Sequence, residues 1–137
     1  MRTQLQRLFN LRTQLYQVKE ENMDRKAEIE KEYQNLRQIF SILEQNEFNL
    51  ISGLLEETAY QKVTLCEMRE IMSGTGMILI HPHDNTKQKA LPIANEYRRT
   101  ANIYALNIKQ LYSLLHKLDD EQQDAFDEWL KESDNYA

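Results

Sequence analysis

Apolar residues recur at alternating intervals of three and four over the first 45 residues, which is the spacing of a coiled-coil seam or of a helix packed along another helix. The middle of this seam is polar, which would weaken a continuous coil. We therefore expect two amphipathic helices, over about 2–22 and 24–44, with Asp24 as N-cap of the second. One long helix is a close alternative, and both predict a helical arm. The seam positions are Leu8, Leu11, Leu15, Val18, Asn22, Arg25, Ile29, Glu32, Leu36, Ile39 and Leu43.

A broad apolar helical face continues from Phe48 to Met72, and Asn46 is the expected N-cap of this helix. Gly53 lies inside it and costs about 1 kcal/mol relative to alanine. Glycine adopts positive φ readily, and two glycines fall in the segment 73–76. The helix is therefore predicted to end there.

A strand-like run of four apolar residues, 77–80, follows and ends at His81-Pro82-His83. A lone strand cannot satisfy its own backbone groups. We therefore expect either an extended loop over the core or pairing with another copy of the chain. The next helix is predicted to begin between 84 and 86, with Pro92 in an early turn, and to continue to 118. Asn107 could instead cap a second short helix.

The last helix is predicted from a capping-box pattern, in which Asp119 or Asp120 is followed three residues later by glutamine. Its acidic first turn favours the positive end of the helix dipole. Phe126, Trp129 and Leu130 would form its apolar side.

The predicted fold class is all-α: a helical arm and an antiparallel helix bundle, with a short extended loop at about 73–83. Only 3 glycines and 2 prolines occur in 137 residues, which disfavours turn-rich sandwiches and barrels. We divide the chain into a helical arm with the first bundle helix (1–45), a central helical oligomerisation and DNA-binding core (46–118), and an acidic C-terminal helix and tail (119–137).

Localisation is expected to be cytoplasmic. No apolar run approaches the roughly 20 residues that a membrane helix needs, and the N-terminus does not resemble a secretory signal. The single cysteine, Cys66, excludes an internal disulfide and is expected to pack in the core.

The net charge is −5, and the charged residues are distributed unevenly along the chain. Residues 73–118 carry a net charge of +4 and residues 119–137 a net charge of −7. Clustered cations can bind DNA phosphates, and repetition of a small cluster in a symmetric ring would make a basic band. An ordinary solvated helix surface is the alternative. The candidate DNA-binding residues are Lys87, Lys89, Arg98, Arg99 and Lys109.

The acidic C-terminal helix resembles a docking element, because aromatic anchors supply contact area and carboxylates supply selectivity. Phe126, Trp129 and Leu130 are its candidate partner-binding residues. A helix folded onto its own domain explains the same pattern equally well.

Catalytic chemistry is disfavoured, because no nucleotide-binding, nucleophile-elbow or His-Glu-x-x-His motif occurs. His81, His83 and Asp84 are the nearest approach to a metal site, but a stable site needs three or four converging ligands. We therefore expect no metal, no cofactor and no enzyme activity. A small helical enzyme that uses the 81–84 cluster is a distant alternative.

The order of these elements resembles the small subunit of bacteriophage terminases. The matching pieces cover about 27–118: Ala27-x-x-Glu30-x-x-Tyr33-x-x-Leu36, the helix from Asn46, Ile80-His81-Pro82, Lys89-Ala90, Arg98-Arg99-x-Ala101, and Leu106-Asn107-Ile108. Two features depart from the family: the heptad-bearing arm replaces a glycine-, proline- and arginine-rich N-terminus, and the Leu106 break lacks the usual glycine and proline.

This resemblance implies a non-catalytic subunit that forms a homo-oligomeric ring. It implies that the subunit binds double-stranded viral DNA and recruits the large terminase subunit, in the host cell cytoplasm. The residues that would then face DNA phosphates are Lys87, Lys89, Arg98 and Arg99. The acidic tail would contact the large terminase subunit. The main alternative is a helical protein–protein adaptor or inhibitor that uses the 1–45 seam and the tail and binds no nucleic acid.

Overall fold

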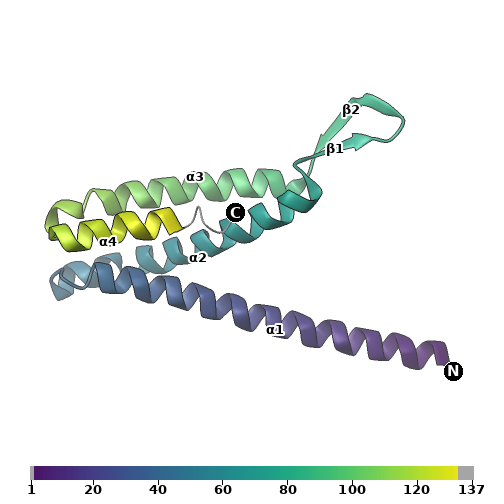
Figure 1. The fold of residues 1–137 in the computed structure, drawn as a ribbon, viewed down its shortest axis with the longest axis horizontal. Coiled ribbons are helices and arrows are strands. Elements are labelled where there is room, and N and C mark those ends of the chain that lie inside the picture. The colour runs from purple at the N-terminus through teal and green to yellow at the C-terminus, as the bar shows by residue number, and fades with distance from the viewer. Residues whose placement is uncertain (1, 133–137) are drawn as a thin grey trace.

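The structure is a computed structural model that describes residues 2–132, apart from the side chains of residue 2 and residues 15–23. Four α-helices, a β-hairpin and a short 3-10 turn make up this part of the chain (Figure 1). The predicted all-α class, with a helical arm and a bundle, is confirmed. The elements are α1 (Arg2–Ile39), α2 (Gln45–Thr75), β1 (Ile78–His81), β2 (Asp84–Ala90), α3 (Pro92–Tyr112), η1 (Leu115–Lys117) and α4 (Asp120–Lys131).

One unbroken helix, α1, replaces the two helices that were favoured, so the single-helix alternative is correct and Asp24 is not an N-cap. No glycine or proline occurs before Gly53, so nothing in this stretch breaks the helix. The polar seam residue Arg25 also has partners. Arg25 donates from Nη2 to Thr64 Oγ1 of α2 at 2.9 Å, and its Nε lies 3.0 Å from the Glu67 carboxylate.

The ends of α2 agree only partly with prediction. The helix begins at Gln45 with Glu44 at the N-cap position, so Asn46 lies inside the first turn and does not cap. At the other end Gly76 has φ of 75° and donates its N–H to the Met72 carbonyl at 2.7 Å. Glycine adopts this conformation without the steric cost of a Cβ. The predicted stop at 73–76 is confirmed.

The strand-like run pairs with the residues that follow it, so neither expected arrangement of a lone strand is correct. Ile78 lies opposite Ala90, Leu79 opposite Lys89 and Ile80 opposite Gln88 in the antiparallel β1–β2 hairpin. This pairing satisfies backbone groups that a helix from 84 would have left open. The predicted helical start at 84–86 is therefore wrong.

The third helix instead starts at Pro92, where the fixed φ of proline suits the first turn. It ends at Tyr112, six residues before the predicted end, and η1 redirects the chain towards α4. Asn107 lies within α3 and donates its side-chain amide to Gln61 Oε1 at 2.8 Å, so it caps no helix. The predicted cap of the last helix is confirmed, because Asp119 Oδ1 accepts from the Gln122 N–H at 2.9 Å.

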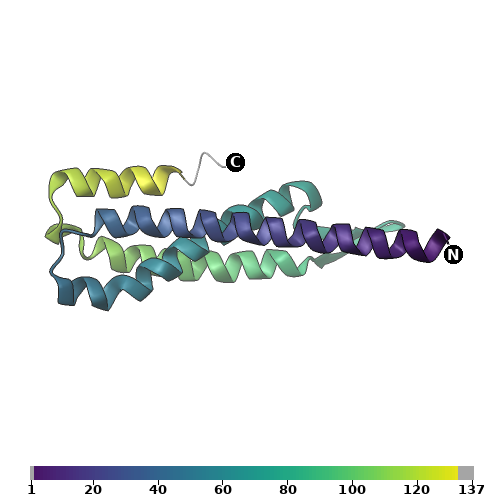
Figure 2. The same ribbon diagram turned by 90° about the horizontal axis from the view of Figure 1, so that it is seen from below.

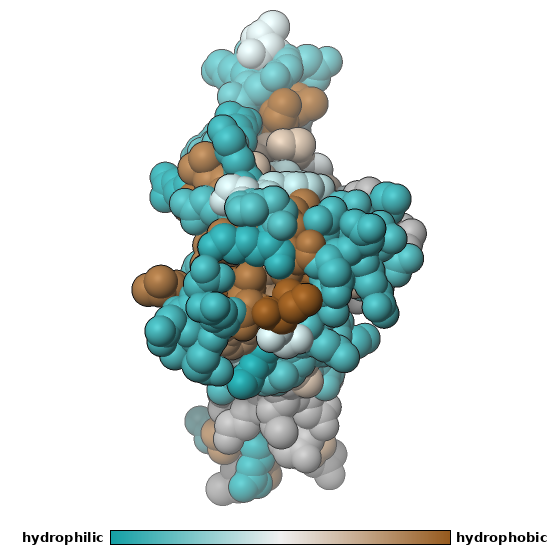
Figure 3. All heavy atoms as spheres, turned by 90° about the vertical axis from the view of Figure 1, so that its left-hand side faces the viewer, coloured by the Kyte–Doolittle hydropathy of each residue, from teal (hydrophilic) through white to brown (hydrophobic). Residues whose placement is uncertain are grey.

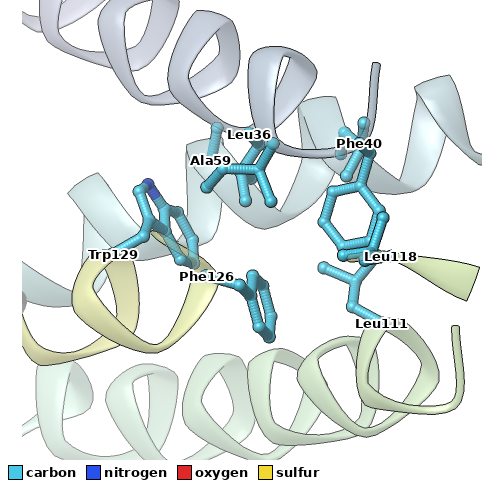
Figure 4. Packing of buried hydrophobic residues seen from close by; sticks show 9 residues of the cluster. Leu36, Phe40, Ala59, Leu111, Leu118, Phe126 and Trp129 are labelled. Carbon is cyan, nitrogen blue, oxygen red and sulfur yellow. The ribbon is translucent and has the colours of Figure 1, made fainter. Parts of the chain in front are cut away.

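The core lies where the four helices meet. The N-terminal half of α1 (about residues 2–20, called the free half of α1 below) and the hairpin extend away from it in the same general direction (Figures 1 and 2). Successive helices run antiparallel. Figure 4 shows the two aromatic side chains of α4 pointing between the other helices. The core draws on all three segments of the sequence, and its buried residues are Leu36, Ile39, Phe40, Leu55, Ala59, Leu111, Leu118, Phe126 and Trp129.

Apolar side chains also reach the surface at the end of the bundle that carries the α1–α2 and α3–α4 connections, where polar residues surround them (Figure 3). Ile42 of the α1–α2 connection is 48% exposed.

Candidate nucleic-acid interface and buried ion pair

The five candidate DNA-binding residues are all exposed, but they lie on two kinds of element. Lys87 and Lys89 belong to β2, not to a helix as expected, and Arg98, Arg99 and Lys109 belong to α3. Side chains two residues apart in a strand point to the same face. Lys89 shares a face of the hairpin with Leu79, which lies opposite it, whereas Lys87 lies beside the register shift between Ile80 and His81 and has no partner residue on β1.

On α3 the cations follow the helix axis. Eleven residues separate Arg98 from Lys109, which is close to three full turns, so the two side chains leave the same side of α3 about 16 Å apart along its axis. Arg99 lies next to this line, and its Nη1 is 3.6 Å from the Glu96 carboxylate. This exposed pair contributes little to stability, and a phosphate could replace the carboxylate.

The acidic helix α4 contacts α3 near Lys109, at the C-terminal end of this line of cations. Tyr112, less than one turn beyond Lys109, makes an edge-to-face contact with Phe126 and a 3.4 Å hydrogen bond to Asp127. Desolvation and the Asp127 carboxylate together raise the pKa of the Tyr112 hydroxyl. Arg98 and Arg99 are therefore farther along α3 from the acidic helix than Lys109 is.

The 81–84 cluster at the hairpin turn makes local contacts. The His83 N–H donates to His81 Nδ1 at 3.1 Å, and Asp84 Oδ1 accepts from both the N–H and the hydroxyl of Thr86. These two hydrogen bonds lower the pKa of the Asp84 carboxyl group. Among the side chains that the structure describes, no group of three or more histidine, cysteine or acidic residues is arranged to hold a metal ion.

The aromatic residues of α4 are inside the bundle. Phe126 is fully buried between Phe40 and Trp129, and Trp129 is 3% exposed, whereas Leu130 is only partly buried. Of the two alternatives for this helix, the structure favours a helix folded onto its own domain for Phe126 and Trp129. A partner that approaches α4 would meet its exposed carboxylates.

A buried ion pair links α1, α2 and α4, and it was not foreseen from the sequence. Lys62, which is 2% exposed, donates from Nζ to Glu32 Oε2 at 3.2 Å and to the Trp129 carbonyl at 2.8 Å. Trp129 Nε1 donates to the same Glu32 oxygen at 2.7 Å. The ammonium also lies 3.8 Å from the centre of the indole ring, a cation–π contact.

Burial lowers the pKa of Lys62, and the neighbouring Glu32 carboxylate opposes this shift. The sequence did contain a signal for the pair. Glu32 interrupts the apolar seam of α1, and Lys62 lies seven residues after Leu55 on the inward face of α2. Two opposite charges at apolar positions of two neighbouring helices predict a pair.

Beside this pair, a cavity of about 230 Å³ lies between α1 and α2. Its lining includes Cys66, which is half-buried and accepts a hydrogen bond from Arg69 at 3.3 Å, so the thiol is not fully in the core as expected. Glu28, Lys31, Glu67 and Glu70 also line it. In the part of the chain that the structure describes, no helix is long and apolar enough to cross a membrane.

Comparisons of the chain with known protein families, curated proteins and solved structures find no significant match.

Proposed function

We propose that this chain is a non-catalytic DNA-packaging subunit of the terminase small-subunit type. Copies of the chain assemble with one another and hold duplex DNA on the basic residues of β2 and α3. The exposed carboxylates of α4 then offer a contact for the large terminase subunit, whose chemistry acts on the bound DNA.

The observation that carries this proposal is the placement of five exposed cations on the continuous segment from β2 to α3. Lysine and arginine release condensed counterions when they neutralise phosphates, and this release supplies most non-specific affinity. The whole chain is acidic, with a net charge of −5. DNA binding therefore depends on the local field of this segment, which repetition around an oligomer would extend.

The test is an electrophoretic shift of duplex DNA by the full chain, with and without Arg98→Glu and Arg99→Glu. We expect the wild type to form a salt-sensitive complex and the double variant to lose affinity. The slope of its log–log salt dependence should be shallower by about 0.9 for each phosphate that the variant no longer neutralises.

The matched control is Lys26→Glu with Lys31→Glu, which makes the same charge change on exposed residues of α1. In Figure 1 this helix lies on the other side of α2 from α3. A control that retains DNA binding, beside a charge-reversed α3 that loses it, supports the basic surface. No complex with wild-type protein at any salt concentration excludes it.

A helical protein–protein adaptor is the second candidate, and the free half of α1 favours it. Side chains 3–14 are all exposed, including Leu5, Leu8, Phe9 and Leu11. Such a surface fits a partner helix without any nucleic acid. Light scattering separates the two candidates: a species of many subunits supports the packaging role, and a monomer or dimer that ignores DNA supports the adaptor.

A further inference from the structure

The β1–β2 hairpin has two chemically different faces. Residues directly opposite each other in an antiparallel pair project to the same face. The register therefore places Ile78 and Ile80 with Ala90 and Gln88 on a face without charge. The other face holds Leu79 with Lys89, and Lys87 lies two residues before Lys89, beside the register shift between Ile80 and His81.

The uncharged face has no cover within the described chain. Ile78 and Ile80 are each 52% exposed, and the hairpin extends away from the bundle (Figure 1). A two-stranded hairpin on its own is marginally stable in water, and stable hairpins usually pack one face on another element. A surface with two half-exposed isoleucines on a projecting element indicates a contact with another molecule.

A complementary surface occurs on the free half of α1. Leu5, Leu8 and Phe9 are spaced i, i+3 and i+4, so they form one apolar stripe, and they are 69%, 63% and 66% exposed. In Figure 1 this half of α1 diverges from the hairpin of its own chain, and the overlap in Figure 2 arises only from the direction of view. The two surfaces can therefore meet only between copies.

We propose that the stripe Leu5–Leu8–Phe9 of one copy docks on the Ile78–Ile80 face of the hairpin of a neighbouring copy. This inference rests on the self-assembly in the proposed function and specifies the contact. Both elements extend from the same end of the bundle. Neighbours that stand side by side in the same orientation therefore bring the arm of one beside the hairpin of the next. Such a head-to-tail contact is the kind that closes into rings.

Charge determines which face of the hairpin the arm can use. Arg12 lies one turn beyond Leu8 and Phe9 on the same side of α1, Arg7 projects from the other side, and the first acidic residue of the chain is Glu20. A cationic arm would be repelled by Lys87 and Lys89, so the uncharged face is the compatible one. Docking there leaves Lys89 exposed on the opposite face, where it can still meet DNA phosphates.

The first experiment compares Ile80→Lys with Leu79→Lys in the full chain by sedimentation velocity. The two variants place the same new charge on adjacent residues of one strand but on opposite faces. We expect Ile80→Lys to weaken association at least tenfold and Leu79→Lys to leave the assembly at its wild-type mass. Circular dichroism checks the helices, which should be unchanged because the hairpin lies outside the core.

The second experiment uses single-cysteine chains in a Cys66→Ser background. A tagged Leu8→Cys chain is mixed with an untagged Ile80→Cys chain, or with an untagged Leu79→Cys chain as the matched control. Mild oxidation should give several-fold more mixed disulfide dimer with Ile80→Cys than with Leu79→Cys.

An assembly that survives Ile80→Lys unchanged, or equal disulfide yields from the two cysteine positions, overturns this contact and leaves the proposed function standing. A wild-type chain that remains monomeric at every concentration overturns both.

Discussion

Substitution Lys62→Met is expected to cost much more than the loss of an ordinary surface ion pair. Methionine keeps much of the volume of the lysine stem but removes the ammonium. Glu32, which is 5% exposed, would then retain one hydrogen bond, from Trp129 Nε1, and the Trp129 carbonyl would lose its donor. The substitution therefore leaves a buried carboxylate without a counter-ion in a medium of low dielectric constant.

Removal of one partner of a buried pair costs about 3–5 kcal/mol, because the remaining charge is uncompensated. The total stability of a domain is about 5–15 kcal/mol, so this loss is a large share of it. For a chain of 137 residues we expect a fall in Tm on the order of 10 °C. Urea denaturation at pH 7 measures the same loss as a lower free energy of unfolding.

The double variant Glu32→Gln with Lys62→Met is the control that tests whether the cost comes from the unpaired charge. The introduced amide can still accept from the indole N–H, and its own N–H₂ has the Trp129 carbonyl nearby as an acceptor. Replacement of both charges of a buried pair is often neutral or stabilising. We therefore expect the double variant to regain most of the lost stability, to within about 1–2 kcal/mol of wild type. A single variant that loses less than about 1 kcal/mol would refute the buried pair. A double variant whose loss of stability equals the sum of the losses in the two single variants would also refute it.

The pH dependence of stability gives an independent check of the same group. The pKa of Lys62 is lower in the folded state than in the unfolded chain, where it has its ordinary value of 10.5. Between these two values the unfolded state binds the additional proton, so the contribution of Lys62 to the free energy of unfolding rises with pH and levels off above 10.5. Lys62→Met should remove this rise. A stability difference between wild type and Lys62→Met that stays constant over this alkaline window would contradict the lowered pKa of Lys62.

Three further substitutions test single features of the fold by thermal or urea denaturation. Gly76→Ala places a Cβ at φ of 75° and should destabilise by about 1–2 kcal/mol, whereas Gly53→Ala, with no atom within 4 Å of its added Cβ, should stabilise by up to about 1 kcal/mol. Equal effects at the two glycines would contradict the assigned backbone geometry. Tyr104→Phe removes a buried hydroxyl that has no hydrogen-bond partner among the described residues, so it should be neutral or slightly stabilising; a loss above about 1 kcal/mol would indicate a partner. Desolvation raises the pKa of Tyr104, so wild type should also lose stability relative to Tyr104→Phe as pH rises above 10, and parallel pH curves would contradict this burial.

Much of the helical architecture followed from local sequence. The helical arm, the stop at Gly76 and the Asp119 cap each depend on near neighbours in the chain: apolar spacing, the φ available to glycine, and a side chain that reaches an N–H three residues away. Such features are determined within one or two turns, and they persist in the folded protein because tertiary packing agrees with them.

Two of the errors occurred where a partner outside the neighbouring helical turn determined the outcome. Polar residues of the α1 seam were expected to interrupt the helix, but Arg25 and Glu32 pair with α2 and α4 across the bundle. Asp84 was expected to start a helix, but the residues after it pair with β1. In both cases a contact outside the local window satisfied groups that local rules had left unpaired.

The candidate surfaces show the same division between sequence and structure. The sequence alone determined that cations concentrate in 73–118, that carboxylates concentrate after 118, and that the chain can form long helices, because these depend on composition and periodicity. Only the tertiary structure decided that Phe126 and Trp129 belong to the core, that Lys87 and Lys89 belong to a hairpin, and that Lys62 is buried against Glu32. The physical reason is that burial depends on which helices meet, and that depends on contacts between residues up to 97 positions apart.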